Sequence, residues 1–320
     1  MHGWIVIDKP VGPGSTPIVS AVKRALRDGG YPKLKVGHGG TLDPLASGVL
    51  PIAIGEATKL CGRMLDSDKL YWFTIRFGVE TDTLDAEGRI VAESAVRPSW
   101  ADVAAALPRF RGTVEQVPPS FSALKVEGER AYDLARAGKD VALAGRTVTI
   151  RLLDRWRGSA YVEWIRGGRY DPAAKPGARD PGGEPPLKEV TLLAHVSKGT
   201  YIRSLARDIA HAVGSRGHVS MLRRLRAGPF TLEQAISLDK LSELAKARSL
   251  EQALLPLTAG LDDIPALPVT PDQARALREG RVAVGTAAQA GLHLATDQSV
   301  PVALVEADGG NLRVVRGFNM

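Results

Sequence analysis

Short runs of apolar and β-branched residues, most of them bounded by Gly, Pro or Asp, recur along the chain and predict strands. The expected strands are residues 4–7, 49–54, 70–77, 89–91, 147–153, 190–196, 302–305 and 312–316. Residues 147–153 and 190–196 are expected to be two strands of one sheet. Because these strands do not alternate regularly with helices, the pattern predicts an α+β fold rather than a doubly wound sheet.

Helices are predicted where apolar residues repeat every three or four positions between capping and stop signals. The expected helices start at the capping residues Ser15/Thr16, Ser99 and Thr270, or cover residues 131–137, 202–213 and 238–244. Between residues 167 and 186, Gly, Pro and charged residues leave almost nothing to bury, which predicts a mobile loop.

Composition is that of a soluble globular protein with 44% apolar residues, and the formal net charge of its 320 residues is +7. The charge is concentrated, since residues 198–226 hold seven Lys or Arg and a single acid, Asp208. A solvated helix face usually mixes charges of both signs. This stretch therefore favours a nucleic-acid partner.

Cys61 is the only cysteine, which excludes an intrachain disulfide and fits a reducing compartment. The four apolar residues at positions 4–7 are too few for a secretion signal, and no run is long enough to span a membrane. We therefore expect a cytoplasmic protein. The six histidines and the cysteine show no zinc spacing, and no P-loop or nucleophile elbow is present, so no metal or cofactor is expected.

The segment GHGGTLDPLASGVLP, residues 37–51, is the strongest candidate for a working site. Its glycines permit sharp turns and close approach to a ligand, and Pro44 keeps Asp43 out of helical geometry. The segment displays one acid, Asp43, and one imidazole, His38, on a stiff loop before a buried strand. Asp43 is therefore either a turn residue or a reactive carboxylate.

This segment resembles the catalytic motif of the TruB family of tRNA pseudouridine synthases, and further blocks occur in the family's order over roughly residues 3–230. They are Asp8-Lys9-Pro10, Gly55–Lys59, Asp66–Tyr71, Gly78–Gly88, Pro118–Lys125, Ser197–Arg203 and His218–Leu225. The chain departs from the family pattern in the glycine pair Gly39-Gly40, where the family usually has a threonine before a single glycine, and by an insertion near residues 157–189.

The resemblance implies a large, mainly antiparallel sheet flanked by helices, with the active site in a central cleft. It also implies a small C-terminal PUA-like domain. We accordingly expect a catalytic domain at residues 1–260, with 167–186 as an insertion loop, and a PUA-like RNA-binding domain at residues 261–320.

The reaction that the resemblance implies breaks the bond from ribose C1′ to uracil N1, turns the base and rejoins it through C5. No redox cofactor or metal is needed. By resemblance Asp43 is the carboxylate involved, either as a nucleophile or as a base at ribose C2′. Arg203 matches the family's arginine partner, which would keep the carboxylate ionised. From the residues alone, Arg203 is equally a phosphate contact or the solvated end of a helix.

The target base must leave the RNA stack to be reached. His38 matches the histidine that fills the vacated space, and Tyr71 matches the tyrosine that stacks on the flipped uracil. Without the resemblance, His38 reads as a turn residue and Tyr71 as a core aromatic. Further candidates for substrate contact are Tyr201, Lys9, Lys59, Asp85, Leu222 and Arg224, of which Leu222 is equally an ordinary core residue.

The resulting hypothesis is a monomeric, stand-alone enzyme of the bacterial type that makes pseudouridine at position 55, in the T stem-loop of tRNA. Two alternatives remain at this point. A non-catalytic RNA-binding protein or RNA chaperone would use the same basic stretch, but it gains nothing from an acid facing a polyanion. A nucleoside glycosidase would need a second acid, for which Asp85 is the candidate.

Overall fold

The computed structural model describes residues 1–122, 124–126, 128–139, 141, 143–156 and 185–320. The predicted loop 167–186 lies outside these residues except for its last two positions. Among the described residues, no helix is both long and apolar enough to cross a membrane.

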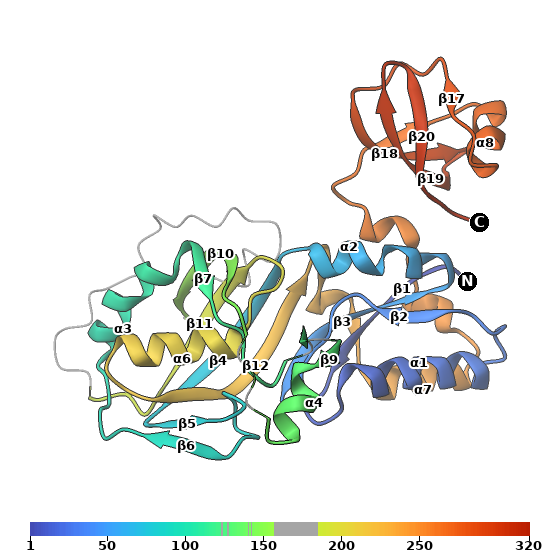
Figure 1. Cartoon of the computed structure of the whole chain (residues 1–320). Coiled ribbons are helices and arrows are strands. Elements are labelled where there is room, and N and C mark those ends of the chain that lie inside the picture. The colour runs from blue at the N-terminus through green and yellow to red at the C-terminus, as the bar shows by residue number, and fades with distance from the viewer. Residues whose placement is uncertain (123, 127, 140, 142, 157–184) are drawn as a thin grey trace.

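One large sheet forms the centre of the molecule (Figure 1). Its strands are β1 (Gly3–Lys9), β2 (Val36–His38), β3 (Ala46–Ile54), β4 (Lys69–Phe77), β7 (Gly112–Gln116), β10 (Arg146–Arg155), β11 (Glu189–Val196), β12 (Gly217–Ala227), β13 (Phe230–Thr231), β14 (Ala235–Ile236) and β15 (Leu255–Pro256). The order is β14-β1-β3-β12-β4-β11-β10-β7, while β2 pairs with β3, β13 with β12 and β15 with β1. Only β12 with β3 and β14 with β1 are parallel, so the predicted mixed, mainly antiparallel α+β sheet is confirmed.

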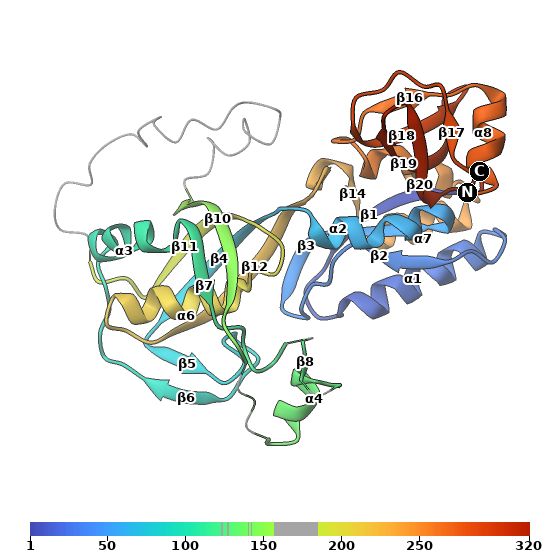
Figure 2. The ribbon, with the colours of Figure 1, turned by 45° about the horizontal axis from the view of Figure 1, so that its top comes forward.

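The α-helices in the described residues are α1 (Ser15–Asp28), α2 (Cys61–Asp66), α3 (Trp100–Ala106), α4 (Ala131–Arg136), α6 (Ile202–Ala212), α7 (Leu238–Lys246) and α8 (Pro271–Arg278). Apolar residues of α1, α3, α6 and α7 share one core with one face of the sheet. Two hairpins, β5 (Val79–Thr81) with β6 (Ile90–Glu93) and β8 (Lys125–Val126) with β9 (Glu129–Arg130), lie outside the sheet. The segment with β8 and α4 projects from one side of the large domain (Figure 2).

Strand β1 is buried on both faces, because successive side chains of a strand point to opposite sides. Ile5 and Ile7 enter the core under the helices. Trp4 and Val6 enter a second core on the other face, which α2 and the 3₁₀ helix Gly55–Leu60 cover. This explains why the strand reads as a continuous apolar run rather than as an alternating one.

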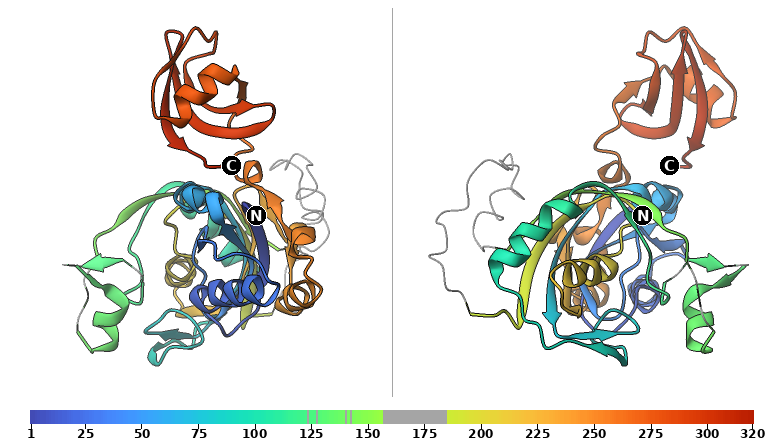
Figure 3. Two further views of the ribbon diagram at one scale, coloured as in Figure 1. Left: turned by 90° about the vertical axis from the view of Figure 1, so that its right-hand side faces the viewer. Right: turned by 60° about the vertical axis from the view of Figure 1, so that its left-hand side comes forward.

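A separate five-stranded sheet forms the C-terminal domain, as predicted (Figure 3). Its strands are β16 (Ala266–Pro268), β17 (Ala283–Val284), β18 (Gly291–Asp297), β19 (Val300–Asp308) and β20 (Asn311–Gly317), in the order β16-β18-β19-β20-β17. Helix α8 packs on it and begins at the predicted cap Thr270, which forms a capping box with Gln273. The two chain ends lie side by side where this domain meets the large one (Figures 1 and 3).

One sequence expectation needs correction, and one long strand was not predicted. The first helix begins at Ser15 itself, with Gly14 as N-cap, and has no side-chain cap. The Ser15 hydroxyl instead bonds with Leu42 of the motif loop. The basic stretch, residues 198–226, ends in the eleven-residue strand β12, which no sequence pattern predicted.

Candidate active site

The motif loop joins β2 to β3 and carries Asp43 between them. Gly39 has no room for a side chain, since a Cβ there would lie 2.7 Å from the Cβ of Met64. At Gly48, with φ +102°, a Cβ would lie 2.1 Å from the carbonyl oxygen of Arg224 on the neighbouring parallel strand. Gly39 therefore lets the motif loop pack closely against α2, and Gly48 lets the start of β3 pack closely against β12.

Backbone atoms on both sides of Asp43 are held by other segments. The Leu42 amide donates to Ser15 Oγ at 2.8 Å. The Pro44 carbonyl accepts from the Gly12 amide at 2.9 Å and from Lys9 Nζ at 3.3 Å. Ser15 is therefore a positioning residue that sequence reasoning missed, because its place just before Thr16 and Pro17 suggested only a helix cap.

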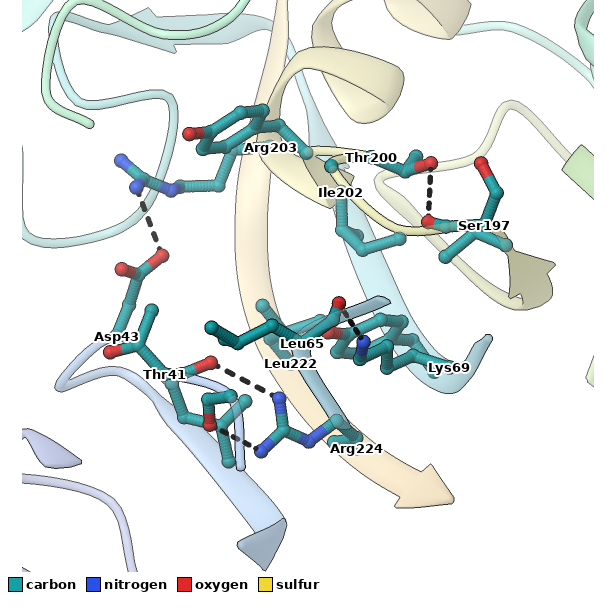
Figure 4. Close-up of a pocket in the computed structure, with 16 residues that line it drawn as sticks. Thr41, Asp43, Leu65, Lys69, Ser197, Thr200, Ile202, Arg203, Leu222 and Arg224 are labelled. Atoms are coloured by element: carbon teal, nitrogen blue, oxygen red, sulfur yellow. Dashed lines mark hydrogen bonds and ion pairs between the residues drawn. The ribbon is translucent and has the colours of Figure 1, made fainter. Parts of the chain in front are cut away.

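Arg224 holds the same loop from below. Its side chain is almost wholly buried, at 1% exposed, and Nε donates to the Val49 carbonyl at 2.7 Å. Nη1 donates to the Thr41 carbonyl at 3.1 Å and Nη2 to the Gly40 carbonyl at 3.0 Å (Figure 4). Three of the five guanidinium N–H donors are thus bonded to backbone carbonyls in and next to the motif loop. The structure therefore supports a positioning role for Arg224.

Asp43 and Arg203 form an ion pair at 2.9 Å, between Asp43 Oδ2 and Arg203 Nη2 (Figure 4). The Arg203 side chain, in the first turn of α6, is only 7% exposed, whereas that of Asp43 is 39% exposed. Arg203 also donates to the carbonyls of Thr83 at 2.8 Å and Phe121 at 3.0 Å. This burial excludes the reading of Arg203 as a solvated phosphate contact, and it leaves the carboxylate as the accessible member of the pair.

Asp85 lies 3.7 Å from Nη1 of the same guanidinium and is buried. Its Oδ1 accepts from Thr83 Oγ1 at 2.6 Å and from the Glu87 amide at 3.1 Å. Asp85 is not part of the pocket lining. Its geometry is that of a residue that orients Arg203, and it does not stand where a second acid would meet a substrate.

The ion pair opens into a pocket of about 280 Å³, near the lower end of the range for small-molecule sites, about 300–1,000 Å³. Its lining residues are Gly40, Thr41, Leu42, Asp43, Leu65, Lys69, Tyr71, Val196, Ser197, Gly199, Thr200, Tyr201, Ile202, Arg203, Leu222 and Arg224. Asp43 is the single acid among them. The pocket thus presents one carboxylate. Aromatic and apolar side chains line it as well, together with three cations, Lys69, Arg203 and Arg224.

Two buried lysines lie close to this pocket. Burial lowers the pKa of Lys9 to about 8 against an opposing attraction from Asp43, and burial likewise lowers the pKa of Lys69 to about 8. Lys69 Nζ donates to the carbonyls of Met64, Leu65 and Ser67, at 2.9, 2.7 and 2.6 Å, and so fixes the C-terminal turn of α2 at the pocket wall.

His38 and Lys59 occupy other places. His38 Nδ1 accepts from the Gly40 amide at 3.4 Å, a turn contact, and burial followed by the Arg224 charge lowers its pKa. Lys59 pairs with Glu56 at 2.7 Å and donates to the Gly317 carbonyl at 2.8 Å. The structure therefore places Lys59 at the junction of the two domains and away from the pocket.

The chain matches known pseudouridylate synthases along most of its length. The chain matches the family descriptions "TruB family pseudouridylate synthase (N terminal domain)" over residues 27–161 and "tRNA pseudouridylate synthase B C-terminal domain" over residues 203–262. It is 60% identical to tRNA pseudouridine synthase B of Novosphingobium aromaticivorans, covering 100% of this chain and 98% of that protein. It is 55% identical to the protein of the same name from Zymomonas mobilis, covering 100% and 96%.

Among solved structures, the chain is similar to a chain of an H/ACA RNP bound to a substrate RNA containing 2′-deoxyuridine. The TM-score is 0.69 at 22% identity, over 99% of this chain and 85% of that one. A chain of a Cbf5-Nop10-Gar1 complex gives the same TM-score of 0.69 at 23% identity, again over 99% and 85%. These likenesses concern the fold, including a PUA-like C-terminal domain. The chain belongs to the TruB family of pseudouridylate synthases, and it is an isomerase.

Proposed function

We propose that this enzyme converts uridine to pseudouridine in tRNA, at position 55 of the T loop. The observation that carries the proposal is the ion pair of Asp43 and Arg203 in a pocket with one acid. A carboxylate facing a polyanion weakens binding, so its placement there serves chemistry rather than affinity. The relatives named tRNA pseudouridine synthase B supply the choice of tRNA.

The proposed reaction balances without an external reactant. The C1′–N1 bond breaks, the uracil turns, a C1′–C5 bond forms, and the proton lost from C5 is replaced by one gained at N1. Asp43 supplies the carboxylate for the first step, as a nucleophile at C1′ or as a base at C2′. Arg203 pairs with that carboxylate and orients it.

Binding is proposed to flip the uridine out of the RNA stack into the pocket. Tyr71 stacks on the uracil, worth about 1–3 kcal/mol for a base on an aromatic ring. Leu222 and Tyr201 line the same space and bound the ring on other sides. His38, on the strand that leads into the motif loop, fills the place that the base leaves.

Mass mapping of uridine isomers in a T-stem-loop RNA tests the proposal. The wild-type protein should form pseudouridine at one position, and Asp43→Asn should bind the RNA but form none, because the substitution keeps the shape and removes the charge. Asp239→Asn, an exposed acid on α7, is the matched control and should behave as wild type. Release of free uracil would instead support the glycosidase, and binding without any product would support the RNA-binding protein.

A further inference from the structure

A second concave surface of about 890 Å³, here called the α1 groove, lies outside the active-site pocket. Its lining comes from the C-terminal half of α1, residues 31–35, strand β2 and the segment that leads into α2. Figure 1 shows where α1, β2 and α2 lie. Its lining residues are Lys23, Leu26, Arg27, Tyr31, Pro32, Lys33, Leu34, Lys35, Val36, Gly37, Thr58 and Cys61. The floor is therefore apolar and the rim is basic.

The charge of the groove is of one sign. Lys23, Arg27, Lys33 and Lys35 are all exposed, and no carboxylate lines the groove. Arg27 pairs with Asp28 at 3.1 Å, but both side chains are more than half exposed, so the pair is weak. Within the described part of the chain, the three lysines make no ion pair. Four neighbouring cations repel one another, and a polyanion relieves that repulsion.

The groove and the active-site pocket draw lining residues from the same two segments of the chain. Cys61 lines the groove and Leu65 lines the pocket, four residues apart and so on one face of α2, about 6 Å along its axis. Gly37 of β2 lines the groove, and Gly40, three residues further along, lines the pocket. An RNA strand with one base in the pocket would therefore have neighbouring phosphates close to the groove.

We propose that the α1 groove binds the phosphodiester backbone of the RNA strand whose uridine enters the active-site pocket. The proposal rests on the proposed function, since it takes the pocket's substrate to be RNA. Lys33 and Lys35 neutralise phosphates within a few nucleotides of the flipped base, and Lys23 and Arg27 extend the contact along α1. The groove thus sets the direction in which the strand leaves the pocket.

The double substitution Lys33→Ala with Lys35→Ala tests this by binding titrations at several salt concentrations. Loss of two phosphate contacts should lower the log–log salt slope by about 1.4–1.8, at 0.7–0.9 per contact, and raise the dissociation constant. The penalty should be equal for an isolated T stem-loop and for full-length tRNA, because the groove contacts nucleotides beside the target. Arg24→Ala removes a neighbouring exposed charge of α1 that does not line the groove, and it should leave the slope unchanged.

Two results would overturn the inference: a double variant with the same slope as Arg24→Ala, or a penalty seen only with full-length tRNA. Binding of inorganic phosphate that is lost in the variant, without a change in RNA binding, would also overturn it. Thermal melting shows whether the variants are folded. Pseudouridine formation by the wild type is measured on the same RNA. If the wild type forms no pseudouridine but the double variant changes the salt slope, the proposed function is wrong and the groove still binds RNA. If pseudouridine forms normally but the salt slope does not change, only the inference about the groove is wrong.

Discussion

Arg203 is bound to two backbone carbonyls and to Asp85 independently of its contact with Asp43. Its guanidinium is therefore held in place before a substrate arrives, and its planar fork serves several acceptors at once. A preorganised cation beside a reacting carboxylate requires no rearrangement during the reaction. At this scale the site depends on the geometry of one arginine as much as on its charge.

Arg203→Lys keeps the charge but cannot make the fork-shaped set of contacts. We expect turnover to fall by about 10²-fold or more, the usual cost of removing one electrostatic donor from an active site. The dissociation constant for RNA should change little, since Arg203 is buried beneath Asp43. Single-turnover rates and binding titrations measure the two effects. Arg207→Lys, one turn further along α6 and paired with Asp208, is the control. A loss confined to affinity would contradict the assignment.

The lowered pKa of Lys9 predicts that the stability of the protein depends on pH. Its pKa is about 8 in the folded protein against an ordinary value of 10.5, so between these values the unfolded chain binds a proton that the folded chain does not. Below pH 8 the folded protein carries the full free-energy cost of burying the Lys9 ammonium, and this cost falls as the pH rises toward 10.5. The free energy of unfolding of the wild type should therefore rise relative to that of Lys9→Met over this window. Urea unfolding at pH 7.5 and pH 10 (roughly the ends of the window) measures it, with Lys240→Met as the exposed control. Parallel changes in both proteins would contradict the prediction.

At the scale of elements, β12 links the two halves of the site. It pairs with β3, which follows the motif loop, and with β4, which carries Tyr71. Charge alone would suggest that the arginines of β12 bind phosphate, but two of them bind other parts of the protein. Arg224 holds the loop, and Arg223 pairs with Asp8 at 2.8 Å and bonds to Ser47. Some basic residues of the stretch 198–226 thus hold parts of the fold together.

Arg224→Ala and Lys198→Ala should separate scaffolding from RNA contact. Arg224→Ala leaves three carbonyls without their donor, each buried group costing about 1–3 kcal/mol, so stability should fall while the salt slope of RNA binding stays constant. Lys198 is 64% exposed, beside pocket residues Ser197 and Gly199, and its pair with Asp66 is on the surface. Lys198→Ala should instead lower the slope by about 0.7–0.9 with little loss of stability. Urea unfolding and salt titrations decide, and the reverse pattern would contradict both roles.

At the scale of the whole molecule, the two domains share a core. Leu294, Leu304 and Phe318 of the C-terminal domain belong to the same apolar cluster as Trp4 and Val49. Around it, the Asn319 amide donates to Glu56 at 2.8 Å and Arg63 pairs with Asp263. Removal of the C-terminal domain would expose apolar side chains of β1 and β3, close behind the motif loop.

Phe318→Ala tests this docking. The buried ring packs against the large domain, and its loss should lower the free energy of unfolding by about 3–5 kcal/mol, the usual cost of removing a buried aromatic ring. Val315→Ala, at an exposed position of β20, should have little effect. Equilibrium unfolding in urea measures both. If Phe318→Ala is as stable as wild type, the domains are independent units. Deletion of residues 262–320 would then test whether the C-terminal domain binds RNA.

Local patterns in the sequence were enough for several features. Strand β1, strand β3, the capping box at Ser99, the cap at Thr270 and the strands at residues 147–153 and 190–196 follow from apolar spacing and capping chemistry, which act between near neighbours. The resemblance of the motif blocks also indicated the family before any geometry was known.

Tertiary structure alone decided what several polar side chains do. Ser15 bonds to Leu42, 27 residues away, instead of capping its helix. Lys59 keeps its local pair with Glu56 and also bonds to Gly317, 258 residues away across the domain junction. Arg203 and Arg224 look alike in a basic stretch, yet one faces Asp43 and the other lies beneath the loop. Burial and long-range pairing set these roles, and neither is encoded in the spacing of residues along the chain.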